Sequence, residues 1–105
     1  MLHLHQNIGY MTINCISMEY VDLAIISAAS IDLKHGFFNM SQDETEIAKA
    51  MIKNSKECML LADNSKLNKI GTWKTCSFSQ VNYYVSNEKN NDMENICKKF
   101  NINYI

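Results

Sequence analysis

The sequence lacks the features that mark membrane, secreted and linker-rich proteins. No stretch approaches the ~20 consecutive apolar residues that cross a bilayer, so no membrane span is expected. The amino-terminal residues lack the basic region and the continuous apolar run of a secretion signal, which predicts a cytoplasmic location. There is no proline, no internal repeat and no low-complexity segment. With 105 residues, the chain is predicted to form one small domain over residues 1–105.

Basic patches and metal-binding motifs are also missing. Ten basic residues are balanced by eleven acidic ones and no basic run exceeds two residues, which argues against direct nucleic-acid binding by this chain. His3 and His5 have no third ligand nearby, so we interpret them as exposed side chains rather than a metal site. The cysteines form no C-x-x-C pair, which argues against a structural zinc. We interpret all four as small, mostly buried apolar residues: Cys15, Cys58, Cys76 and Cys97.

The composition that is present is an ordinary globular one, with 47% hydrophobic and 20% charged residues. A chain this short buries only a modest fraction of its surface. This favours either a homo-oligomer or an origin in a larger parent domain.

A strand and a helix are predicted in the first half of the chain. The apolar run Val21–Ser27 is typical of a strand buried on both faces of a parallel sheet, and a loop of small and polar residues follows over 28–36. Ser41 and Glu44 have the spacing of a capping box, which predicts a helix over about 42–55. The residues upstream are less informative. Only residues 11–16 show an alternation of apolar and polar side chains, and this weak alternation suggests a strand.

A second apolar run, Cys58–Ala62, predicts another strand, which ends at the polar residues 63–66. Strand, helix and strand in this order imply a right-handed crossover and a parallel pair. The polar ends of both strands then open at the same edge of the sheet, which is where open α/β sheets bind ligands. This order places Asp32 and Lys66 near that edge.

The last quarter of the chain continues the alternation. Residues 81–86 predict a third strand, and Asn91–Glu94 has the spacing of a second capping box. Asn101 is expected to stop the helix, and residues 103–105 are expected to add a short final strand. The helix between them has an apolar stripe formed by Met93, Ile96, Cys97 and Phe100. Together these elements predict an α/β fold with a small, open, mostly parallel sheet and flanking helices.

Three blocks of sequence resemble the C-terminal sensor domain of DeoR-family transcriptional repressors. They are VDLAIISAASIDLKHG, then E-x-x-x-x-K-A-M-I-x-x-S-K-E, then LLADNSKLNKIG. Their order and spacing agree with that family over about residues 21–85, whereas residues 1–20 match it poorly. The resemblance implies a fold related to ribose-phosphate isomerase and glucosamine-phosphate deaminase. It also implies that the domain detects a phosphorylated sugar without cofactor or chemistry.

The resemblance also implies a ligand site. It assigns Asp32 and Gly36 to a first pocket loop, Glu44 to the start of a covering helix, and Asp63, Ser65 and Lys66 to a second pocket loop. A lysine ammonium suits a phosphate, and carboxylates suit sugar hydroxyls. From the residues alone, the structural interpretations are favoured: Asp32 as a turn residue, Lys66 as a solvated lysine and Glu44 as a helix cap. The resemblance makes ligand binding by Asp32 and Lys66 about as well supported as these interpretations.

The sequence departs from the family pattern in several places. No helix-turn-helix is present, and the Gly/Thr-rich phosphate loop expected upstream of residue 21 is missing. Ser30 stands where the family usually has Gly, and Phe37 and Phe38 stand where a Thr is common. We therefore expect a truncated sensor domain without its DNA-binding domain.

Three functions fit these observations. The first is a regulatory sugar-phosphate sensor that acts through self-association and has no catalytic residue. The second is a ligand-free remnant or oligomerisation module. The third is a small isomerase-like enzyme with Asp32 or Asp63 as its base, which the incomplete phosphate site disfavours.

Overall fold

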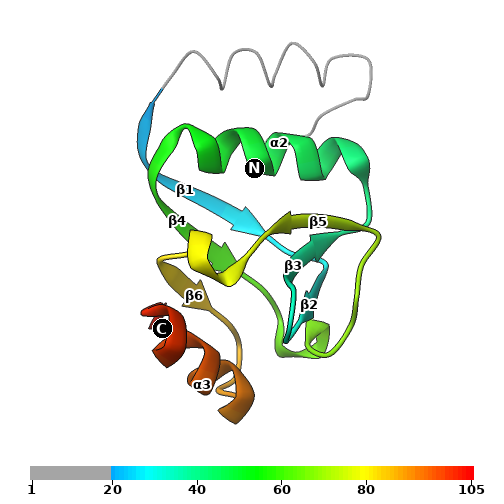
Figure 1. Ribbon diagram of the computed structural model, residues 1–105, viewed down its shortest axis with the longest axis vertical. Helices are drawn as coiled ribbons and strands as arrows, with labels where there is room; N and C mark the ends of the chain where they lie inside the picture. Colours follow the sequence, from blue (N-terminus) through cyan, green and yellow to red (C-terminus); the bar gives the residue numbers. More distant parts are fainter. Residues whose placement is uncertain (1–19) are drawn as a thin grey trace.

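The centre of the structure is a parallel sheet. The computed structural model describes residues 20–105, and within them the sheet contains β1 (Val21–Ser27), β4 (Ser55–Leu61), β6 (Tyr83–Val85) and β7 (Asn103–Tyr104). The strand order is β1-β4-β6-β7, and every neighbouring pair is parallel (Figure 1). The predicted α/β fold with a small, mostly parallel sheet is confirmed. The predictions for His3, His5, Cys15 and residues 11–16 lie outside the described residues.

The predicted bounds of two strands were wrong by a few residues. The strand expected at Cys58–Ala62 begins at Ser55, and the strand expected at 81–86 is only Tyr83–Val85. In the second case Val81 is buried without belonging to a strand, because it closes the short 3-10 helix η2 (Phe78–Gln80). Val81 is therefore apolar because it is buried, although it does not belong to a strand.

A second sheet occupies the region where a loop was predicted over 28–36. It is antiparallel, in the order β2-β3-β5, with β2 (Ser30–Asp32), β3 (Gly36–Asn39) and β5 (Trp73–Cys76). In Figure 1 this sheet lies at the carboxyl end of β1. The loop prediction was wrong because a three-residue strand is too short to show the alternation that identifies strands. The middle strand, β3, also pairs with β5, which is distant in sequence.

The helix α2 (Gln42–Lys53) begins as predicted. Ser41 is its N-cap, and the Ser41 hydroxyl accepts a hydrogen bond from the Glu44 N–H at 3.4 Å. The helix ends two residues before the predicted end, because the side chain of Asn54 donates to the carbonyl of Ala50 at 2.9 Å and caps it.

The helix α3 (Asn91–Phe100) has its N-cap one residue earlier than predicted. The side chain of Asn90, not Asn91, accepts from the Met93 N–H at 3.1 Å. Because Asn90 and Asn91 are adjacent and both suit an N-cap, the sequence pattern does not determine which of them caps the helix. Asn101 ends the helix in the left-handed conformation with φ 56°, as a stop residue should.

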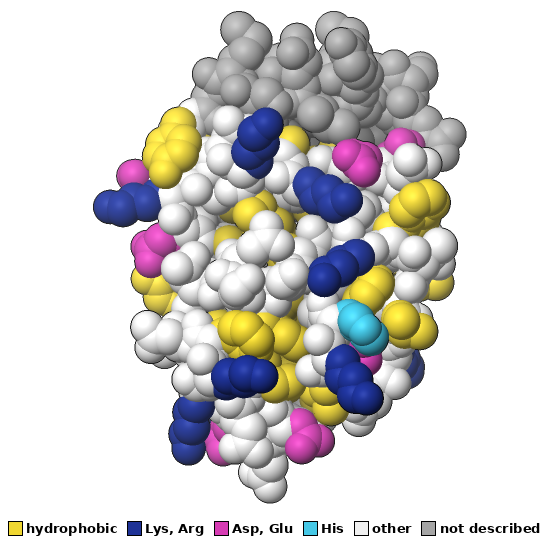
Figure 2. Space-filling view, in the orientation of Figure 1, with side chains coloured by type: hydrophobic (Ala, Val, Ile, Leu, Met, Phe, Trp, Pro, Cys, Tyr) yellow, Lys and Arg dark blue, Asp and Glu magenta, His cyan; other side chains and the backbone are white. Residues whose placement is uncertain are grey.

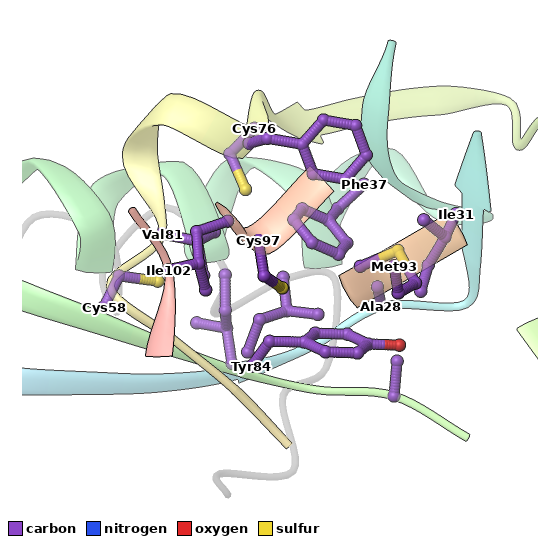
Figure 3. Packing of buried hydrophobic residues seen from close by; sticks show 14 of the residues in the cluster. Ala28, Ile31, Phe37, Cys58, Cys76, Val81, Tyr84, Met93, Cys97 and Ile102 are labelled. Carbon is purple, nitrogen blue, oxygen red and sulfur yellow. The ribbon is translucent and has the colours of Figure 1, made fainter. Parts of the chain in front are cut away.

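Both helices pack on the same face of the parallel sheet. The strands are added in chain order, so right-handed crossovers carry α2 and α3 to one side. The core on this side joins strand residues to helix residues, and Figure 3 shows Phe37, Tyr84, Met93 and Cys97 gathered in it. The rings of Phe37 and Phe78 meet edge to face with centroids 5.1 Å apart.

The opposite face of the sheet is apolar, and no helix among residues 20–105 covers it. Leu23 is 39% exposed, Ile25 50% and Leu61 38%, whereas Ala24, on the helix side of β1, is 2% exposed. Parallel sheets usually have both faces covered. No helix in this part of the chain is long and apolar enough to cross a membrane. On the face drawn in Figure 2, the lysine side chains are spread over the described surface among apolar and acidic side chains.

Candidate functional site

The carboxyl ends of three parallel strands meet at one edge of the sheet, as the predicted order requires. The N–H of Ala28, just after β1, donates to the carbonyl of Leu61 at 3.3 Å. The N–H of Ala62, just after β4, donates to the carbonyl of Val85 at 3.1 Å. The two predicted pocket loops, residues 28–36 and 63–66, both start from this edge, and the second runs on into Leu67.

Backbone contacts fasten the two pocket loops to each other. Ile31 and Leu67 form an isolated parallel bridge, and the N–H of Lys69 donates to the carbonyl of Ile31 at 3.1 Å. Asp32 and Lys66 are each one residue from this bridge. The structure thus brings together the backbones of the two loops that carry the predicted site residues.

Asp32 has a local partner. Its carboxylate pairs with Nδ1 of His35, and the N–H of His35 donates to the Asp32 carbonyl at 3.2 Å. The hydrogen bond from the His35 side chain holds the pKa of Asp32 below its usual value. Asp32 therefore closes the turn of the β2–β3 hairpin, which is the structural alternative named from the sequence.

Gly36 is needed by the backbone. It is buried with φ +115°, and a Cβ built at this position would lie 2.4 Å from the carbonyl oxygen of Cys76. Neither the conformation nor the space accepts another residue. The glycine is explained by the packing of the hairpin against β5, with no ligand required.

In the second pocket loop, Asp63 caps the 3-10 helix η1 (Asn64–Lys66). Its carboxylate accepts from the Ser65 N–H at 2.8 Å, and this bond lowers the pKa of Asp63. The Ser65 side chain is exposed. The ammonium of Lys66 lies within 4 Å of no carboxylate in the described part of the chain. Lys66 is therefore a cation next to the strand ends with no ion-pair partner among residues 20–105.

A third loop reaches this edge, which the sequence analysis did not include. The side-chain oxygen of Asn87, two residues after β6, accepts from the N–H of Asn64 at 2.7 Å. It also accepts from the Ser86 hydroxyl at 3.3 Å. The signal was available, because Ser86 and Asn87 are polar residues that directly follow a parallel strand.

A hollow in the surface lies beside this edge but is lined by none of the five predicted ligand residues. It is a shallow depression between β1 and α2, open to solvent, with a cavity volume of about 20 Å³. Ser27 and Glu44 border it together with buried Asn39, whose amide donates to Thr75 Oγ1 at 2.7 Å. Glu44, predicted to begin a covering helix, is in the first turn of α2 as expected.

The cysteines among the described residues are buried thiols of low reactivity. Cys58, Cys76 and Cys97 are buried and free, and burial raises their pKa values to about 11, 12 and 11. Within residues 20–105 no group of three or more His, Cys, Asp or Glu side chains is placed to hold a metal ion. The interpretation of these three thiols as buried apolar residues is confirmed.

Comparison with known proteins gives two findings. The family model described as the DeoR C terminal sensor domain matches residues 3–88. A glycerol-3-phosphate regulon repressor of Haemophilus influenzae is 26% identical over 92 residues, which are 88% of this chain and 36% of the repressor. The chain thus spans about a third of the length of that relative. Both findings point to a regulatory sensor domain and not to an enzyme, and the chain belongs to the family of DeoR C-terminal sensor domains.

Proposed function

We propose that this chain is a regulatory module that senses a phosphorylated sugar or polyol at the edge formed by its two pocket loops and transmits the signal by self-association. Family membership supports a sensor domain. The observation that carries the proposed site is the bridge between Ile31 and Leu67, because it couples the loop of Asp32 to the loop of Lys66. A ligand that touches both loops would then act on one connected unit.

The chemistry of the second pocket loop suits a phosphate. Lys66 offers a cation with no ion-pair partner among the described residues, and the chain contains no arginine, so lysine and backbone N–H groups are its phosphate donors. Asp63 uses one carboxylate oxygen to cap η1, which leaves the other for a sugar hydroxyl. The similar repressor of Haemophilus influenzae is named for a glycerol-3-phosphate regulon, which makes glycerol 3-phosphate the first compound to test.

A thermal-shift titration tests this proposal. A ligand that binds only the folded state adds ~2.7 kcal/mol of stability at a hundredfold excess over its dissociation constant, which raises the melting temperature. We expect one of a panel of sugar and polyol phosphates to do this for the wild type and not for Lys66→Ala. Lys56→Ala is the matched control, because Lys56 is an exposed lysine at the amino end of β4. Equal shifts in both variants would contradict the role of Lys66.

A ligand-free association module is the second candidate. It is favoured by the structural roles of Asp32 and Gly36 and by the hollow, which none of the predicted ligand residues lines. A protein that melts cooperatively and shifts with no phosphate in the panel would support this candidate over the sensor.

A further inference from the structure

The strand β1 forms an edge of the parallel sheet within residues 20–105. It pairs with β4 along one side through six residue pairs between Val21 and Ser27, and its other side has no strand partner in that part of the chain. The opposite edge is β7, which has only two residues. If another strand extends this sheet, the β1 edge can therefore form many more backbone hydrogen bonds with it than the β7 edge can.

The β1 edge has few of the protections that keep solvent-facing edges from pairing. Such edges usually carry charged side chains, a proline, a bulge or very few residues. This strand reads VDLAIIS, keeps one register with β4 throughout, and has Asp22 as its one charged side chain. Leu23 and Ile25 are 39% and 50% exposed on its uncovered face. The edge therefore has the composition of a covered strand.

A shallow apolar hollow lies next to β1 on the helix side of the sheet. It is lined by Ile25 and Ile26 of β1 and by Ile47, Ala48 and Met51 of α2. A strand laid against β1 would direct alternate side chains over this apolar surface and the others beside Leu23 and Ile25.

We propose that the partner of β1 is β1 of a second copy of this chain, paired antiparallel about a two-fold axis at Ala24. In this register Leu23 lies opposite Ile25 of the second copy, so the exposed apolar side chains meet each other. The uncovered faces of the two sheets join on one side into a single surface.

The charge pattern of β1 fits such a self-pairing. Asp22 lies opposite Ile26 of the second copy, so the two Asp22 side chains are four residues apart along the ribbon, about 14 Å. This exceeds the Debye length of about 8 Å at physiological ionic strength, so their repulsion is small. The strand thus pairs with itself without a like-charge contact, and two-fold dimers are the commonest closed oligomers.

This inference deepens the self-association in the proposed function by naming its surface. Sedimentation velocity on the full chain over a wide concentration range measures it. We expect the wild type to reach twice the chain mass of 12.1 kDa. Ile25→Lys should raise the dimer dissociation constant about tenfold or more, because it places an ammonium against Leu23 of the second copy.

The matched control is Ile70→Lys, because Ile70 is 70% exposed and lies between η1 and β5, away from the edge. It should dimerise like the wild type. Ile25→Lys must retain the circular dichroism spectrum of the wild type, and Leu23→Lys replaces it if it does not. A wild type that stays monomeric at every concentration, or equal weakening by Ile25→Lys and Ile70→Lys, overturns the proposal.

Hydrogen exchange of the wild type keeps the proposal testable without any variant. The outward-facing amides of β1 should become protected as the concentration rises. Full protection in the monomer would instead assign the edge to residues 1–19 of the same chain and overturn the dimer. If the wild type dimerises but no phosphate changes its melting temperature, this inference is supported and ligand sensing is rejected. If the wild type and Ile25→Lys are both monomers that a phosphate stabilises, ligand sensing is supported and the dimer is rejected.

Discussion

The two pocket loops start from the same sheet edge but are built differently. The first is folded into an antiparallel hairpin, whose second strand contains Phe37 with 0% exposure and Phe38 with 7%. The second makes a single turn of 3-10 helix and leaves Ser65 exposed. Packing therefore explains the residues of the first loop, whereas packing within residues 20–105 does not explain Ser65 and Lys66. Any ligand recognition is expected to depend mainly on the second loop.

The largest effect is expected from Phe37→Ala. Phe37 contacts Phe78 and Tyr84 in the core, and deleting such a ring costs about 4 kcal/mol, a large part of the stability of a small domain. Urea unfolding measures this loss. Phe100→Ala is the control, since Phe100 is 36% exposed and should cost much less. Similar losses for the two variants would show that the first loop is not anchored in the core.

Gly36→Ala should lower the free energy of unfolding by about 2–3 kcal/mol, because alanine is strained at φ +115° and its Cβ meets the Cys76 carbonyl. Titrating the same variant with the phosphate panel then tests whether Gly36 also serves ligand binding. A stable variant that has lost a ligand shift would mean that Gly36 serves the ligand rather than the backbone.

The smallest effect concerns the pH dependence of the second loop. The lowered pKa of Asp63 means that its carboxylate stabilises the fold above its usual pKa of about 4, and that this contribution disappears as the pH falls through the lower folded-state pKa. Asp63→Asn keeps an oxygen for the Ser65 N–H but removes the charge. Its melting temperature should be slightly below that of the wild type near neutral pH, and the difference should shrink as the pH falls below about 4. A difference that is constant with pH would contradict the role of the charge.

Much of the fold followed from the sequence because its signals are local. The bounds of Val21–Ser27 and the cap at Ser41 depend on neighbouring residues, and both are confirmed. The antiparallel sheet was missed because β3 pairs with β5 across more than thirty residues. No local pattern records such a pairing.

The candidate site was less predictable for the same reason. Sequence reasoning placed Asp32 and Lys66 at one edge, and the loop-to-loop bridge agrees with that. It did not reveal that His35 pairs with Asp32 or that Cys76 forces a glycine at position 36, because both depend on how the hairpin packs. Whether these residues bind a ligand stays a prediction.

The order β1-β4-β6-β7 also has a consequence for synthesis on the ribosome. Chains fold as they emerge from the amino terminus, and here each new strand of the described sheet docks beside the one made before it. The parallel sheet therefore grows in one direction and never needs to open for a late insertion. β1 is the first of these strands to be made, and no later strand of the described chain covers its outer side.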